Sequence, residues 1–153
     1  MHVSPELSIE SLAPGLADVF APHPIAAAYI FGSAARGQMT PFSDIDVALL
    51  LTAGCVAKSD HLKFELSLEA EIAERCGLSE TDVRIINDAP LIVRGRVLTE
   101  GVLLYVRDDE FRIDFETRTR TEYFDFLPAV EYLREAFFAD VRKRGLDGQH
   151  SEN

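Results

Sequence analysis

The sequence predicts an α/β (α+β) protein in which helices flank a small mixed β-sheet and a long helix forms the C-terminus. Short apolar runs bounded by glycine, proline or aspartate alternate with segments whose apolar residues recur every three or four positions. From Asp108 to Arg144 the chain contains no glycine. Its 153 residues suffice for one domain, which we place at residues 1–145, and the polar residues 146–153 predict a disordered tail.

The first part of the chain predicts interrupted helical structure and then a buried strand. Residues 8–20 carry apolar side chains at helical spacing, but Pro14 and Gly15 interrupt them. We therefore expect one broken helix or two short helices there. The apolar run 25–31 ends at Gly32, a pattern typical of a strand that is covered on both faces.

The middle of the chain alternates between turn, strand and helix signals. Ser59 or Asp60 can cap a helix that Gly77 ends, and Pro90 opens a shorter helix that Gly101 ends. The expected elements are, in order, a turn at 34–43, a strand at 44–51, a helix at about 60–76, a strand at 82–86, a helix at about 90–99 and a strand at 102–106.

The C-terminal part predicts one long helix, because apolar residues recur at helical spacing from about 108 to 144. Pro128 is the position at which we expect any kink. The helix is richer in aromatic residues than one apolar stripe requires. We expect most of them to pack against the sheet and a subset to form a partner surface. These residues are Tyr123, Phe124, Phe126, Phe137 and Phe138.

The charge of the chain limits the classes of partner. A net charge of -11 with only three lysines disfavours DNA or RNA as a direct partner and favours a protein with a basic face. No apolar stretch approaches the ~18 residues of a membrane span. The N-terminus lacks the pattern of a signal peptide, so we expect a cytoplasmic protein.

The residues with the clearest chemical signal lie between the first two expected strands. Gly32 allows backbone amides to approach a triphosphate, and Ser33 can donate from its hydroxyl and its amide. Ten residues later, Asp44 and Asp46 alternate along a strand and so point to the same face. Carboxylates in this arrangement suit magnesium, and a pair of ions there can clamp an in-line displacement at phosphorus.

Two further residues of this segment are candidates for nucleotide binding. Arg36 carries a fork of donors that matches phosphate oxygens, and Ser43 directly precedes Asp44. Each feature alone is a weak signal, because an Asp-x-Asp sequence after a strand is common in turns and on soluble surfaces. The ordered combination of all of them is much more specific.

The run GSAARGQMTPFSDIDVALL resembles the signature of the DNA polymerase β-type nucleotidyltransferase superfamily, a Gly-Ser pair followed after ten residues by Asp-x-Asp. Within that superfamily, the short chain resembles the minimal nucleotidyltransferase (MNT) antitoxins of HEPN–MNT toxin–antitoxin pairs. The segments TDVRIINDAPLIVRGRVLTEGVLLYVRD and FETRTRTEYFDFLPAVEYLREAF also resemble that family. The likeness covers most of residues 25 to 140 and implies a polymerase β-like nucleotidyltransferase fold.

The resemblance assigns roles to residues of the motif. It implies that Asp44 and Asp46 bind metal and that Gly32 and Ser33 hold the triphosphate of the nucleotide. Asp82, on the neighbouring strand, takes the place of the third carboxylate. It would complete one metal site and help to deprotonate the incoming hydroxyl. The alternative for Asp82 is a structural acid at a turn between helix and strand.

Two positions near Asp82 leave alternatives open. Arg84 shares a face with Asp82 on the expected strand, so it can bind phosphate or pair with Asp82 and weaken metal binding there. Asn87 and Asp88 follow in a loop, and we expect both to be structural.

The resemblance implies a reaction and a partner. ATP would donate AMP with the help of Mg²⁺, with two ions expected, and pyrophosphate would be released. The acceptor would be a tyrosine of a cognate HEPN ribonuclease toxin, which the antitoxin neutralises within a hetero-oligomer. One rival is an antitoxin that only binds and occludes its toxin. Another is a small-molecule transferase of the aminoglycoside type, which the lack of an acceptor domain disfavours.

Overall fold

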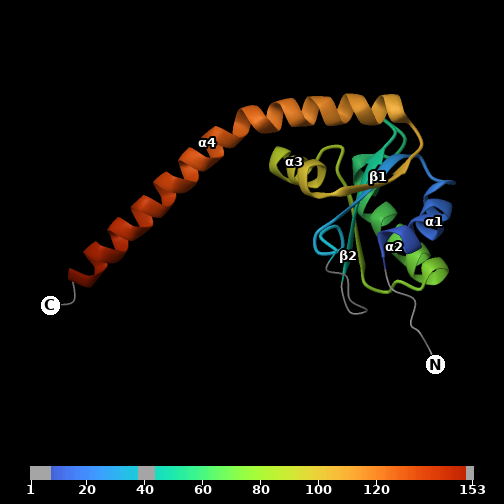
Figure 1. Cartoon of the computed structure of the whole chain (residues 1–153), viewed down its shortest axis with the longest axis horizontal. Coiled ribbons are helices and arrows are strands. Elements are labelled where there is room, and N and C mark those ends of the chain that lie inside the picture. Colours follow the sequence, from blue (N-terminus) through green and yellow to red (C-terminus); the bar gives the residue numbers. More distant parts are fainter. Residues whose placement is uncertain (1–7, 38–43, 151–153) are drawn as a thin grey trace.

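The computed structural model describes residues 8–37 and 44–150, with the side chains described as far as Gly145. A short 3-10 turn, η1 (Lys58–Asp60), precedes the second helix. The main elements are α1 (Ile9–Phe20), β1 (Ile25–Phe31), β2 (Ile45–Leu51), α2 (His61–Cys76), β3 (Thr81–Ile85), α3 (Leu91–Glu100), β4 (Val102–Val106) and α4 (Asp109–His150) (Figure 1).

The four strands form one mixed sheet in the order β3-β2-β1-β4. β1 runs antiparallel to both β2 and β4, whereas β2 and β3 are parallel. The two central strands are almost entirely buried, which agrees with their continuous apolar sequences. The small mixed sheet predicted from the sequence is therefore confirmed, and each predicted strand lies within one residue of its observed bounds.

Helices cover both faces of the sheet and divide the core in two. On one face, α1 and α2 pack on alternate residues of the strands, including Ile30, Val47 and Val83. On the other face, α3 and the first part of α4 pack on the intervening residues, including Tyr29 and Ala48. Because side chains alternate along a strand, Asp46 belongs to the same face as Ala48 and so to the side of α3 and α4.

The prediction of a broken or double N-terminal helix was wrong. α1 is one helix from Ile9 to Phe20, with Pro14 inside it. The proline removes one backbone hydrogen bond. Leu16, Val19 and Phe20 after the proline are nevertheless fully buried, and Ile9 and Leu12 before it pack against the same core, which anchors the turns on both sides of the proline.

The glycine and proline at the helix ends lie where the sequence predicts, whereas Asp60 occupies the N-cap position of α2 without a side-chain hydrogen bond to the helix. Gly77 ends α2 with a left-handed backbone at φ 69°, and Pro90 caps the start of α3. Among the residues that the structure describes, no helix combines the length and the apolar character needed to cross a bilayer.

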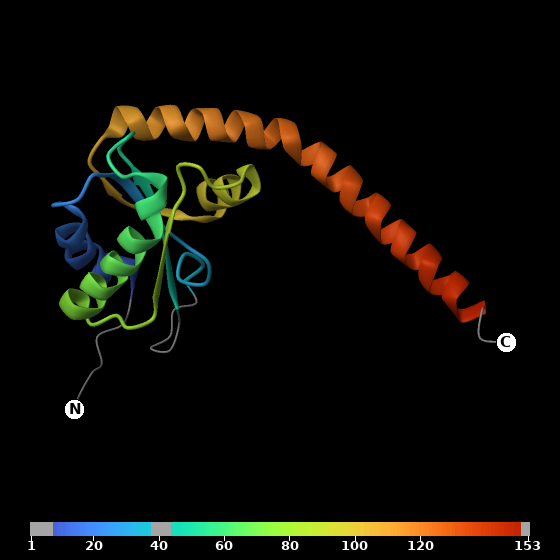
Figure 2. The ribbon, with the colours of Figure 1, turned by 180° about the vertical axis from the view of Figure 1, so that it is seen from behind.

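α4 is the long C-terminal helix that the sequence predicts, but it reaches further. It runs from Asp109 to His150, and Gly145 does not take the left-handed conformation that ends a helix. The first part lies across α3 and the sheet. The helix bends near Pro128, and the remainder extends away from the rest of the chain (Figures 1 and 2).

Candidate nucleotide and metal site

Three carboxylates meet at the end of the sheet where β1 ends and β2 and β3 begin. Asp44 directly precedes β2, and Asp46 is the second residue of that strand. The register places Asp46 opposite Phe31 of β1 and opposite Asp82 of β3. Neighbouring strands lie about 4.8 Å apart, so the fold brings together acids that are far apart in sequence.

Gly32 is fixed by its close approach to Asp46. Its φ is +73°, a conformation that other residues rarely adopt. A Cβ atom added at Gly32 would lie 2.5 Å from Oδ2 of Asp46. A side chain at position 32 would therefore push the Asp46 carboxylate aside, so the glycine and the aspartate depend on each other.

The electrostatics of the cluster centre on Asp46. Burial raises the pKa of the Asp46 carboxyl above its ordinary value, and the nearby carboxylates of Asp82 and Asp44 raise it further. The guanidinium of Arg84 acts in the opposite direction. The cluster thus carries more negative charge than its own residues neutralise, which favours a cation among these oxygens.

Arg84 contacts one of the three acids directly. Its Nε donates to Oδ1 of Asp82 at 3.1 Å, and both side chains remain largely open to solvent. The shared face expected from the sequence is confirmed. The bond joins Arg84 to the outermost carboxylate and leaves both alternatives for this arginine standing: it can bind phosphate or compete with a metal for Asp82.

The turn after β1 carries the candidate nucleotide-binding residues. The backbone amide of Arg36 donates to the carbonyl of Ser33 at 3.2 Å, and Gly37 donates to Ala34 at 3.3 Å. Ser33 is half-buried, whereas Arg36 is exposed on the turn. Ser43 lies outside the described residues.

The donors at this site fit a hard divalent cation. Within residues 8–37 and 44–150, no group of three or more His, Cys, Asp or Glu side chains is placed to hold a metal ion. Magnesium does not need such a group, since it commonly uses one or two carboxylates and completes its shell with water and substrate phosphates. Asp44 and Asp46 carry oxygens of this kind.

The loop after β3 is structural, as expected. The Asn87 side chain accepts from the Leu51 amide and donates to the Leu51 carbonyl, both at 2.8 Å. These two bonds satisfy the backbone at the far end of β2. Asp88 makes an exposed ion pair with Lys58 at 3.7 Å.

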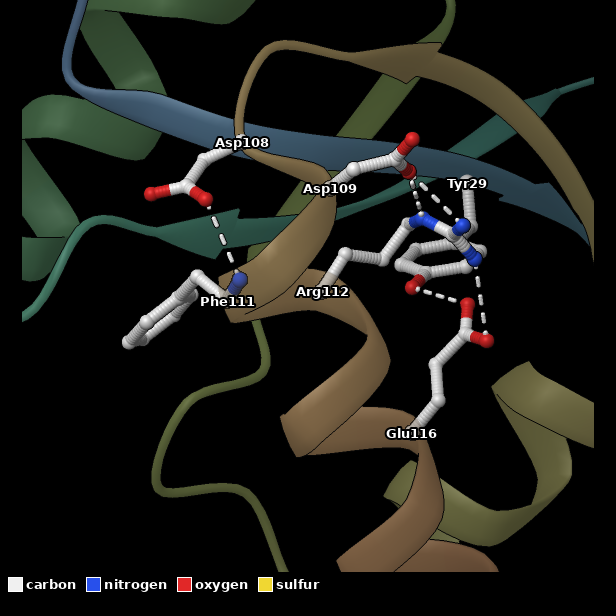
Figure 3. A network of polar contacts seen from close by, with 6 residues as sticks. All are labelled: Tyr29, Asp108, Asp109, Phe111, Arg112 and Glu116. Atoms are coloured by element: carbon white, nitrogen blue, oxygen red, sulfur yellow. Dashed lines mark hydrogen bonds and ion pairs between the residues drawn. The ribbon is translucent and has the colours of Figure 1, made fainter.

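A second polar cluster, which the sequence reasoning missed, lies on the same face of the sheet (Figure 3). The hydroxyl of Tyr29 donates to Oε1 of Glu116 at 2.7 Å, and Arg112 donates to the other oxygen of Glu116 at 3.1 Å. Arg112 also donates to Asp109 at 2.8 Å. Burial and the Glu116 carboxylate raise the pKa of Tyr29 strongly. The only sequence signal was a tyrosine inside an apolar strand.

The family comparison covers the region that holds the carboxylates and the Gly32 turn. The sequence profile of the family described as Polymerase beta, Nucleotidyltransferase matches residues 15–110. No curated protein sequence matches the chain.

Several solved structures share the fold. A toxin–antitoxin with AMP-PNP is 20% identical, with a TM-score of 0.63 over 85% of this chain and 98% of that chain. A tri-AMPylated Shewanella oneidensis HEPN toxin in complex with MNT antitoxin gives 18% identity and a TM-score of 0.59, over 88% and 98%. A toxin–antitoxin MntA-HepT gives 21% and 0.55, over 88% and 97%.

Proposed function

This chain belongs to the polymerase beta nucleotidyltransferase family, and we propose that it transfers AMP from ATP to a tyrosine of a HEPN ribonuclease toxin. In this role it is an antitoxin that neutralises the toxin by modifying it. The observation that carries the proposal is the intact site: Gly32 at φ +73° against Asp46, with Asp44 and Asp82 beside it.

The structural neighbours support the choice of acceptor. One is a toxin–antitoxin with AMP-PNP, and another is an MNT antitoxin in complex with a tri-AMPylated HEPN toxin. The candidate site is open to solvent, with Asp44 exposed. An acceptor carried on a partner protein fits such a site.

The proposed reaction is a single displacement at phosphorus. The tyrosine oxygen attacks the α-phosphorus of ATP, a new P–O bond forms, and the bond to the β-phosphate breaks to release pyrophosphate. Bound magnesium would neutralise charge on the phosphates. Gly32 and Ser33 hold the triphosphate in line, Asp44 and Asp46 supply the metal-binding oxygens, and Asp82 accepts the proton of the hydroxyl.

Modification of this kind would inhibit a ribonuclease by opposing the binding of its RNA substrate. An adenylate adds a bulky anionic group beside the residues that cut RNA. The RNA backbone is itself anionic, so both steric overlap and charge repulsion oppose its binding.

The test is the intact mass of the cognate HEPN toxin after incubation with the chain, magnesium and ATP. We expect a gain of one or more adenylates that is lost with Asp44→Asn. Glu74→Gln, an exposed acid on α2, is the matched control and should leave the gain unchanged.

The alternative is an antitoxin that only binds and occludes its toxin. The bond from Arg84 to Asp82 favours it, because a carboxylate held by arginine is a poorer ligand and a poorer base. A tight complex without any mass gain, equally tight with Asp44→Asn, would establish this alternative and reject the transferase.

A further inference from the structure

The distal part of α4 exposes far more apolar surface than a solvated helix tolerates. We call residues 126–145 the arm; it carries the part of the helix that extends away from the sheet (Figures 1 and 2). Large apolar side chains on a free helix of this kind indicate a surface that another molecule covers. The most exposed are Tyr132 at 72%, Leu133 at 63% and Phe137 at 63%.

The apolar seam of the arm continues a face of α4 that is already packed. In the first part of the helix, Phe115 and Thr119 are buried, and Tyr123 lies so close to α3 that a Cβ atom at Gly95 would overlap its ring. Alternating steps of three and four residues carry the same face onward. The seam residues of the arm are Phe126, Val130, Leu133 and Phe137.

The arm is apolar on more than this one face. Tyr132 and Phe138 each follow or precede a seam residue directly, so they point about 100° away from it. Phe138 is 46% exposed, and Arg134 lies over its ring at 5.6 Å. A helix that is apolar on several sides requires a partner that encloses it, as a groove does.

A second copy of the chain does not meet this requirement. Two arms paired through their seams would each contribute four seam residues, which is two heptads. A coiled coil is indicated by three or four heptads or more. Such a pair would also leave Tyr132 and Phe138 in water. The net charge of -11 on each chain opposes self-association further.

The distribution of charge along the arm predicts which charges lie at each end of a complementary groove. Whereas the whole chain is strongly acidic, the end of the arm carries three consecutive basic residues, Arg142, Lys143 and Arg144. The first turns carry Glu131 and Glu135 with Arg134 between them, and Asp140 offsets part of the basic end through its 3.1 Å pair with Arg144. A complementary groove has acidic side chains at the end that receives Arg142–Arg144 and basic side chains at the other end.

The arm also lies on the side of the molecule that carries the candidate site. It leaves the chain beyond α3, and α3 covers the same face of the sheet to which Asp46 belongs. In both views the arm descends on the side where α3 and the light-blue Gly32–Gly37 turn lie (Figures 1 and 2). A protein held by the arm is thus on the side from which the open carboxylate cluster is reached.

We propose that the arm docks in an apolar groove of the acceptor protein and holds that protein in front of the carboxylate cluster. This inference rests on the proposed function for the identity of the acceptor. Docking and transfer are separable, because the seam lies on the free part of α4 and the carboxylates lie on the sheet. The arm supplies affinity, and the cluster supplies chemistry.

The test compares three forms of the full chain for binding to the cognate HEPN toxin. Leu133→Ser combined with Phe137→Ser alters two exposed seam residues, and Glu135→Ser alters an exposed charged residue of the same arm. We expect the double substitution to weaken binding at least about 30-fold, as for two hot-spot side chains, and the control to change it less than about threefold. Circular dichroism should show equal helix content in all three.

Separate readouts distinguish this inference from the proposed function. Asp44→Asn should bind the HEPN protein as tightly as the unsubstituted chain while transferring no adenylate. Equal binding by the double variant would overturn the arm as the docking element and leave the transferase intact. Light scattering should find the chain alone to be a monomer. A dimer that the double substitution dissolves would assign the arm to a second copy and overturn the inference, as would no binding by the unsubstituted chain.

Discussion

Two groups of carboxylates lie on the same face of the sheet and differ in how the protein treats their charge. Glu116 and Asp109 share the guanidinium of Arg112, and Glu116 also receives the hydroxyl of Tyr29. Asp82 and Asp44 both add negative charge beside Asp46, and the cation that opposes them among the described residues is the exposed Arg84. The negative charge of the first group is neutralised by side chains of the protein, whereas that of the second group is left to be neutralised by a bound cation.

The difference separates structural acids from functional ones. Arg112 and Glu116 are only 17% and 15% exposed, so their pair links the start of α4 to β1 in a region of reduced solvent screening. A carboxylate whose pKa is raised by burial and by like charges destabilises the folded state when ionised. Such clusters are typical of functional sites, where the binding of a ligand offsets the free-energy cost of the clustered charges.

The largest expected effect is on the function of the unneutralised group. Asp46→Asn should lower adenylate transfer at least about 100-fold, because it removes a metal-binding oxygen and charge at the reacting phosphate. The same change relieves repulsion, so the melting temperature should be equal or higher. Intact mass and thermal unfolding measure the two effects. A variant that transfers normally would contradict the assignment of Asp46.

The next effect is on stability, in the neutralised group. Arg112→Met should lower the free energy of unfolding by about 3 kcal/mol, since it leaves Glu116 uncompensated in a mostly buried position. The control is Arg118→Met on the same helix, whose 2.9 Å pair with Asp114 is 65% and 63% exposed. There the loss should stay below about 0.5 kcal/mol. Equal losses in urea unfolding would reject the contrast.

A smaller loss is expected when the tyrosine alone is changed. Tyr29→Phe removes the donor to Glu116 and should cost about 1.5 kcal/mol. The folded protein holds the Tyr29 proton more tightly than the unfolded chain, whose tyrosine has the ordinary pKa of 10.0. The stability from this proton is therefore present below about pH 10 and is lost as the pH rises further. Unfolding at pH 9 and pH 11 should show a smaller pH dependence in Tyr29→Phe.

The smallest effect is expected at the boundary of the unneutralised group. Arg84→Gln should change stability by less than about 1 kcal/mol, because both side chains of its pair with Asp82 are solvent-screened. If the arginine competes with metal for Asp82, half-maximal transfer should need less magnesium. Arg75→Gln on α2 is the control with no change. An increased demand for ATP without a change in magnesium demand would instead assign Arg84 to phosphate binding.

Local sequence patterns predicted most elements, because the strands are continuous apolar runs and the turns carry glycine or proline. The patterns failed where tertiary burial outweighs a local rule. Pro14 stays inside one helix because Leu16, Val19 and Phe20 are anchored in the core. The Tyr29–Glu116 bond joins residues 87 positions apart, and no local pattern contains such a contact.

The sequence by itself contains the spacing of Gly32, Ser33, Asp44 and Asp46, and this spacing indicated the family and the fold. It also predicted that Asp44 and Asp46 share a face, because side chains alternate along a strand. Only the tertiary structure decided that Asp82 lies beside Asp46, that Gly32 leaves no room for a side chain, and that the end of α4 stands bare. Those facts depend on strand register and on which surfaces remain uncovered after packing. Both follow from contacts between distant segments rather than from local pattern.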